Sequence, residues 1–106
     1  MSWREDAILG QVTIGAGTTI KKVVAYTPTL APASVAAATV AEETFTVTGL
    51  TTDDIVVVNQ PAISNATGVA GARVSAANTL AIRFVNPTAG ALVPTSGVFT
   101  VLAFRK

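Results

Sequence analysis

Two adjacent pairs of acidic residues come nearest to catalytic chemistry in this chain of 106 residues, namely Glu42-Glu43 and Asp53-Asp54. Two carboxyl groups held about 5–10 Å apart can hydrolyse a glycosidic bond, one as an acid and the other as a nucleophile or base. Neighbouring residues of a β-strand point to opposite faces of the sheet, so neither pair converges by itself. We therefore expect no carboxylate catalysis.

Histidine and cysteine are both absent from the sequence. The chain thus lacks the commonest general base, the strongest side-chain nucleophile and the usual transition-metal ligands. Asp53 and Asp54 could offer oxygens to calcium, but their spacing matches no calcium loop, and capping of a turn is the favoured role. The glycosylation triplet at residues 65–67 is interpreted as accidental, because no signal peptide is visible, and the Gly-Ala-Gly of residues 15–17 as a simple turn. We expect a protein that is not an enzyme and has no metal or cofactor.

The charges are few and dispersed. Seven Lys and Arg residues against six Asp and Glu give a net charge of +1, and the cations form no long run. Nucleic acid is therefore not an expected partner, because phosphate recognition relies on clustered cations. Residues 1–10 lack the apolar core of a signal peptide, and no apolar run reaches the roughly 18 residues of a membrane span. The sequence predicts synthesis in the cytoplasm and no membrane partner.

The second half of the chain alternates between short strands and turns. The expected strands are residues 43–48, 55–58, 72–76, 79–86 and 98–105. Within residues 79–86, Leu80, Ile82 and Phe84 share one face, and Phe84 is the first choice for the core. Residues 55–58 are apolar throughout, which favours a strand covered on both faces. Asn78 tolerates the left-handed region, so residues 77–78 are expected to form a tight turn.

The first forty residues carry a weaker pattern. Residues 8–13 and 18–26 are plausible strands, and residues 34–43 are either a helix or, as we prefer, an extended segment after Pro28 and Pro32. About seven short strands, spaced by about ten residues, predict an all-β fold: an antiparallel β-sandwich or a small jelly-roll-like barrel. Within this single unit, residues 1–30 form an N-terminal arm or edge strands, and residues 31–106 form the β-sandwich domain.

The composition predicts an exposed apolar surface. Half of the residues are hydrophobic, whereas 12% are charged, about half the usual share of roughly 25%. A domain this small cannot hide so much apolar surface inside one copy, and exposed apolar area marks an interaction surface. Both sides of the last strand are largely apolar, with Phe99, Val101 and Ala103 on one side and Val98, Leu102 and Phe104 on the other. A central position, or an outer face covered by a neighbouring subunit, would explain this pattern.

The later part of the chain resembles a known family. The resemblance is carried by residues 44–59 (TFTVTGLTTDDIVVVN), 71–80 (GARVSAANTL), 82–89 (IRFVNPTA) and 97–101 (GVFTV). These strand and turn motifs, which cover roughly the last sixty residues, are similar to a module of small virion structural proteins of tailed bacteriophages. The resemblance implies a virion structural role, and a head decoration (cement) protein is the leading assignment.

Such a role would place the protein on the capsid surface, bound to the major capsid protein and to further copies of itself. A homotrimer is expected, because a closed ring suits the three-fold positions of a shell and buries outward apolar faces. The expected interface residues are Trp3, Ile8, Tyr26, Val98, Leu102 and Phe104. The alternative is a receptor-binding or carbohydrate-binding module on a tail fibre or the head surface. Against it, the loops at residues 62–71 and 86–97 contain no aromatic residue.

Overall fold

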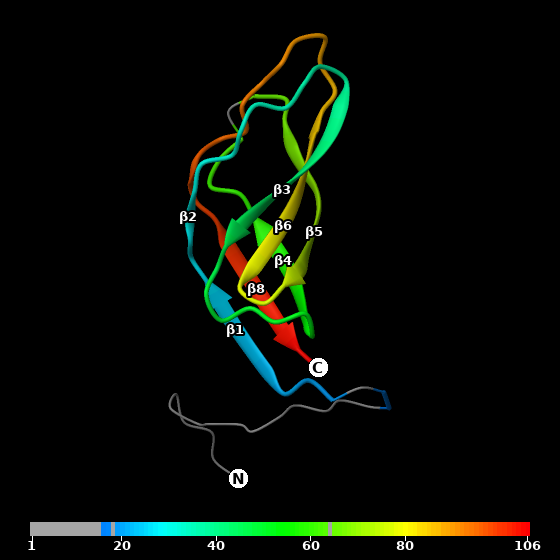
Figure 1. The fold of residues 1–106 in the computed structure, drawn as a ribbon, viewed down its shortest axis with the longest axis vertical. Helices are drawn as coiled ribbons and strands as arrows, with labels where there is room; N and C mark the ends of the chain where they lie inside the picture. The colour runs from blue at the N-terminus through cyan, green and yellow to red at the C-terminus, as the bar shows by residue number, and fades with distance from the viewer. Residues whose placement is uncertain (1–15, 18, 64) are drawn as a thin grey trace.

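The computed structural model describes residues 16–17, 19–63 and 65–106, and all regular secondary structure in this part of the chain is β-strand. The strands are β1 (Lys22–Tyr26), β2 (Thr29–Leu30), β3 (Thr39–Thr46), β4 (Asp54–Asn59), β5 (Gly68–Ala76), β6 (Thr79–Asn86), β7 (Gly97–Val98) and β8 (Thr100–Arg105). They form antiparallel sheets that stack as a small β-sandwich (Figure 1). The predicted all-β class is confirmed, with eight strands where about seven were expected.

One layer of the sandwich is the three-stranded sheet β1-β8-β4. Its central strand, β8, pairs antiparallel with β1 on one side and β4 on the other. Just before β8, the short strand β7 pairs with β2, and Val98 lies opposite Thr29. A central position was one of the two explanations for the apolar pattern of residues 98–105, and β8 occupies it, although the expected strand is interrupted at Phe99.

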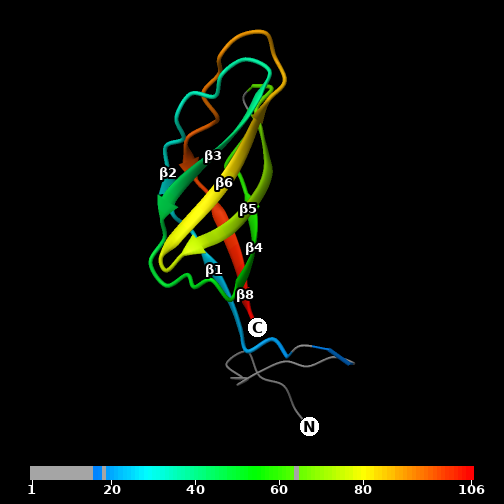
Figure 2. The ribbon, with the colours of Figure 1, turned by 45° about the vertical axis from the view of Figure 1, so that its right-hand side comes forward.

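The other layer is the three-stranded sheet β3-β6-β5. Its central strand, β6, has the bounds that the alternation of residues 79–86 predicts. Leu80, Ile82 and Phe84 point inward and are almost completely buried. In Figure 2 the β3-β6-β5 layer crosses in front of β4, β8 and β1. The core lies between the two layers.

Phe84 lies at the centre of this core and is 1% exposed. Its ring meets those of Phe45 and Phe99 edge to face, each with a centroid separation of 6.5 Å, a favoured geometry for aromatic pairs. The buried cluster comprises Leu30, Val35, Val47, Leu50, Val74, Leu80, Ile82, Phe84, Phe99, Val101 and Ala103. Phe84 is thus the core residue that the sequence predicted.

Two turns, one in the β5–β6 hairpin and one in the β3–β4 connection, are hydrogen-bonded to each other at one end of the sandwich. Asn78 adopts φ 61° between β5 and β6, as expected for that turn, and its side-chain Oδ1 accepts the Gly49 N–H at 2.8 Å. Gly49 itself has φ 105°, and a Cβ atom there would lie 3.0 Å from the Tyr26 hydroxyl. The left-handed backbone favours glycine at this position, and a Cβ atom would in addition crowd the Tyr26 side chain. Asn78 also donates its N–H to Leu50 and accepts that of Val47 through its carbonyl oxygen, which ties the hairpin to the β3–β4 connection.

The preference for extended backbone over residues 34–43 is confirmed. Val35 forms an isolated antiparallel bridge with Leu92, and β3 then begins at Thr39. Within residues 1–30, β1 and β2 pair with the sandwich, while residues 1–15 lie outside the described part of the chain. No helix in the described residues has the length and apolar character to cross a membrane.

Candidate functional site

The outward side of the β1-β8-β4 sheet carries an uncharged apolar surface. Two cross-strand rows make it up: Val23, Phe104 and Ile55 in one row, and Ala25, Leu102 and Val57 in the next. We call these six residues the open face. Val23 and Ile55 are each 52% exposed and Val57 is 58% exposed, whereas Leu102 and Phe104 are partly covered by their neighbours. Valine and isoleucine favour strands, so the same side chains that form this sheet leave it with an apolar exterior.

The alternation along β8 explains how the open face arises. Val101 and Ala103 point into the core, so Leu102 and Phe104 between them must point outward. The expectation that residues 55–58 are covered on both faces is wrong, because β4 is the edge strand of its sheet and nothing in the described chain packs on Ile55 and Val57. An apolar run without alternation indicated burial on both faces, but the described residues bury only one face of β4.

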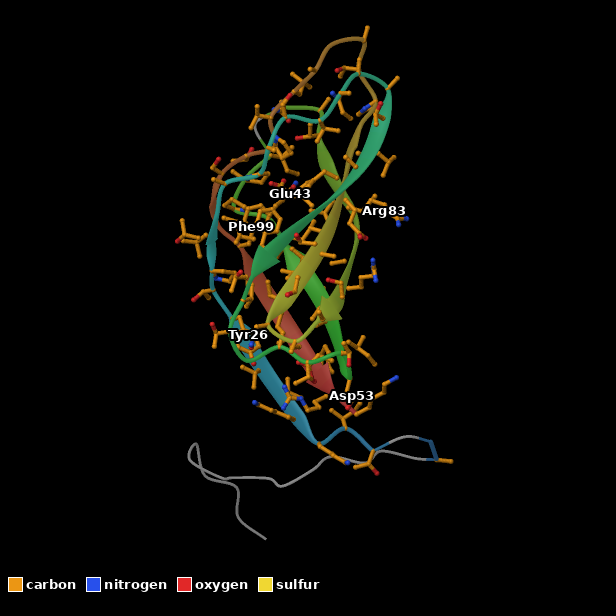
Figure 3. The ribbon with its side chains drawn as sticks, viewed as in Figure 1. Tyr26, Glu43, Asp53, Arg83 and Phe99 are labelled. Carbon is orange, nitrogen blue, oxygen red and sulfur yellow. The ribbon has the colours of Figure 1, made fainter. Side chains whose placement is uncertain are left out.

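The two ends of the open face differ in character. Toward β7 the same outward row continues through Thr100 to Val98, which is 51% exposed and lies opposite Thr29. At the opposite end, the register of β8 with its neighbours leads on to Lys21, Lys106 and Asp53, all of them exposed. Figure 3 shows Asp53 at this end, close to the C-terminus. The open face is thus uncharged along its length and bounded by a small excess of cations at one end.

The outward side of the other sheet is polar. Arg73 donates to Glu42 through Nη2 at 2.9 Å and through Nε at 3.2 Å, and Arg83 Nη2 lies 4.0 Å from the same carboxylate. The hydrogen bond from Arg73 holds the pKa of Glu42 below its usual value. Arg83 projects away from the sandwich in Figure 3. These exposed ion pairs add little stability, but they make the two outer sides of the molecule chemically distinct.

The carboxylate pairs do not converge, as their strand positions predicted. Glu42 points outward to Arg73, whereas Glu43 accepts the backbone N–H of Ala33 at 2.9 Å. Asp53 is exposed, but the side chain of Asp54 is 1% exposed. Within the described residues, no three acidic side chains gather where they could hold a metal ion.

Asp54 instead closes the end of the sandwich. Arg105 donates to it through Nε at 2.7 Å and Nη2 at 3.1 Å, and the Thr51 N–H donates at 3.0 Å. These hydrogen bonds, that of Arg105 above all, lower the pKa of Asp54, although burial opposes the shift. The bond from Thr51 is the turn-capping contact that the sequence predicted for this pair of aspartates.

The Asn-Ala-Thr triplet also has a structural role. Asn65 Oδ1 accepts both the N–H and the hydroxyl of Thr67, and Asn65 Nδ2 donates to the Val93 carbonyl at 2.8 Å. Asn86 and Thr88 repeat the arrangement at the end of β6. Each triplet is an Asx turn that satisfies loop backbone groups, and residues 65–67 lie within the loop expected over residues 62–71.

The structure brings three of the expected interface residues onto one side of the molecule. Leu102 and Phe104 belong to the open face, and Val98 lies in the same outward row. Tyr26 packs against the core and faces Gly49, so it contributes nothing to this surface. Trp3 and Ile8 lie outside the described residues. The sequence reasoning missed Val23, Ile55 and Val57 as interface residues. For Ile55 and Val57 the available signal was the unbroken apolar run of β4, whereas Val23 is identified by its pairing with Phe104 of β8.

No protein-family description, curated protein or solved structure matches this chain.

Proposed function

We propose that this chain is a bacteriophage virion structural protein, a capsid decoration protein that assembles as a homotrimer and binds the major capsid protein on the assembled head. It would be made in the host cytoplasm and act on the capsid surface. The observation that supports this proposal is the open face, since the described residues leave a three-strand apolar surface without a cover. Surfaces of this kind mark contact with another protein.

The free energy available from covering the open face favours several linked contacts over a single one. Full burial of a Val, Leu, Ile or Phe side chain is worth about 1.5–3 kcal/mol, and the five large side chains of the open face are already partly buried, so covering them stabilises a complex by about 3–6 kcal/mol. Association costs about 4–15 kcal/mol in lost freedom of motion. One such face therefore holds a partner weakly, and several copies linked in a ring hold it strongly.

Decoration also requires nothing that the sequence lacks. A protein that binds only the assembled shell stabilises it by mass action, to an extent set by its concentration and its dissociation constant. No nucleophile, metal or cofactor takes part in that effect. The absence of histidine and cysteine is compatible with such a role.

Co-sedimentation with empty heads that lack this protein tests the proposal. The wild-type chain should pellet with the heads, saturably, and raise the temperature at which they fall apart. Val57→Lys places a charge in the open face, through which copies would associate, so it should disrupt the trimer and thereby weaken binding to heads at least tenfold, the effect of about 1.4 kcal/mol. Val40→Lys is the matched control, because Val40 is 52% exposed on the other sheet. Absence of wild-type binding to the heads would contradict the proposal.

A carbohydrate-binding module is the competing outcome of the same experiment. Stacking on sugars requires exposed rings, and the described aromatic side chains lie on β1, β3, β6 and β8 or between β7 and β8, not in the loops. Saturable binding of the purified protein to glycans, without binding to heads, would favour that module instead.

A further inference from the structure

The open face needs an occupant, and the sequence before β1 has the right chemistry for one. Residues 8–14 read Ile-Leu-Gly-Gln-Val-Thr-Ile, and every second position from Ile8 is apolar or glycine. We infer that residues 8–14 of one copy cover the open face of an adjacent copy, so that copies exchange N-terminal segments around a closed ring. This inference rests on the oligomeric part of the proposed function, and it does not depend on the capsid.

Length and pattern match the surface to be covered. Seven extended residues span about 23 Å and the six residues of β8 about 20 Å, at about 3.3 Å per residue. Laid along β8, Ile8, Val12 and Ile14 would point to the same side. Gly10 lies between them, where the absence of a side chain lets the backbone approach the sheet closely. The segment thus brings an apolar stripe to an apolar surface of the same length.

Charge favours an adjacent copy over the same copy. The cations at the end of the open face, Lys21 and Lys106, lie at the end of the sheet where the chain enters β1. A segment folding back from its own β1 would start at this end and carry Glu5 and Asp6 away from it. A segment from another copy can run in the opposite direction and place both acidic side chains beside the lysines, an attraction that survives only at short range in salt.

Exchange of this kind closes naturally into a ring. Each copy gives one segment and accepts one. In a ring of three the contact is heterologous, and such contacts end only when the rotation between copies closes. A trimer satisfies that condition and leaves no open face uncovered. The polar side of the β3-β6-β5 sheet, with Glu42, Arg73 and Arg83, remains exposed in every copy.

Disulfide trapping in the full-length protein provides the test, because the natural chain contains no cysteine. Val12→Cys and Val57→Cys are made as separate variants, mixed, and oxidised. The inference predicts disulfide-linked pairs containing one copy of each variant. A mixture of Val12→Cys with Val40→Cys is the matched control and should give few linked pairs, because Val40 lies on the other sheet.

Three results would overturn the inference. Equal linkage to Val40→Cys would show chance collision. Dimers of Val57→Cys alone, in the same yield as in the mixture, would show that two open faces pack on each other. A double variant of Val12 and Val57 that closes within one chain would show that the segment covers its own copy.

Native mass measurement completes the experiment. The full chain should have the mass of a trimer, about 32 kDa from a 10.7 kDa chain, and a variant lacking residues 1–14 should be monomeric. If that variant remains a trimer, the inference is wrong even when wild-type protein decorates heads. Trapped pairs without any binding to heads would leave the exchange intact and remove the capsid function.

Discussion

Asp54 and Arg105 form the most enclosed ion pair among the described residues, and it gives the fold a defined dependence on pH. The Asp54 side chain is 1% exposed and accepts three hydrogen bonds. Its pKa is lowered in the folded protein from the ordinary value of 3.8, chiefly by Arg105. A carboxyl group with a lowered folded pKa contributes stability above its unfolded pKa, and this contribution is lost as pH falls through the folded value.

Comparison with Asp54→Asn should isolate that contribution. At neutral pH the variant should be less stable by about 1.5–2 kcal/mol, the lower part of the range for bonds to charged groups, because solvent reaches Arg105. The difference should persist down to pH 3.8 and shrink below it as the wild-type carboxylate is protonated. Denaturant unfolding at a series of pH values measures it. Asp53→Asn, an exposed control, should change stability by less than about 0.5 kcal/mol; a difference that grew on acidification would contradict this account.

Asn86 organises the loop at the other end of β6. It is completely buried, its Nδ2 donates to the carbonyls of Val35 and Gly90, and its Oδ1 accepts from the N–H and hydroxyl of Thr88. Every hydrogen-bonding position of the amide is used. Only an amide of this shape offers two donors and one acceptor oxygen in this arrangement.

Asn86→Asp should therefore destabilise the protein strongly. The replacement has the same shape, but it removes both donors and places a carboxylate against two carbonyl oxygens, at a cost of about 3 kcal/mol. Thermal and urea unfolding would measure the loss. Asn59→Asp makes the same chemical change at an exposed position and should be nearly neutral. Equal effects at the two sites would show that the network at Asn86 contributes nothing.

At the scale of the strands, sequence patterns predicted the elements whose two faces differ. β6 was predicted to the residue because Leu80, Ile82 and Phe84 alternate with smaller or polar side chains, and a shift by one residue would expose them all. β4 offered no such contrast, so its pattern predicted a strand correctly but wrongly predicted that both of its faces are covered. The pairing of β8 with both β1 and β4, which creates the open face, depends on contacts far apart in the sequence.

The polar contacts were the least predictable part. Asp54 and Arg105 are 51 residues apart, as are Asn86 and Val35, and no local pattern marks such partners. Asn78 was predictable because its role is local, in a two-residue turn with a left-handed backbone. Of the open face, Leu102 and Phe104 were found from the alternation of one strand, whereas Val23, Ile55 and Val57 required the register across three strands.

Substitutions at Asn78 can separate two local effects on stability, namely the left-handed backbone of the turn and the side-chain hydrogen bond to Gly49. Asn78→Gly keeps the left-handed backbone and loses only the bond to Gly49, which should cost about 0.5–1 kcal/mol. Asn78→Ala loses the same bond and adds about 1–2 kcal/mol of backbone strain. Equilibrium unfolding of both variants should therefore rank them wild type, Gly, then Ala. Equal stability of the Gly and Ala variants would show that the turn relaxes to another conformation.

For the whole molecule, the contrast between its two outer sides decides what kind of association it can undergo. The open face offers apolar area without charge, while the opposite side offers Glu42, Arg73 and Arg83. Association that buries apolar area has a negative heat-capacity change, and it becomes weaker on cooling. Contact through exposed ions would instead weaken with added salt. Temperature and salt therefore distinguish the two sides without any knowledge of the partner.

We expect self-association to weaken when the protein is cooled from about 25 °C to about 5 °C, because the stabilisation from buried apolar area decreases on cooling. Dilution calorimetry at several temperatures should give a negative heat-capacity change for assembly, and sedimentation should show more monomer in the cold. Moderate salt should loosen assembly only slightly, through Lys21 and Lys106. Arg83→Gln should leave both measurements unchanged, since Arg83 lies on the opposite side. Assembly that strengthened in the cold and disappeared in salt would assign the interface to the charged side instead.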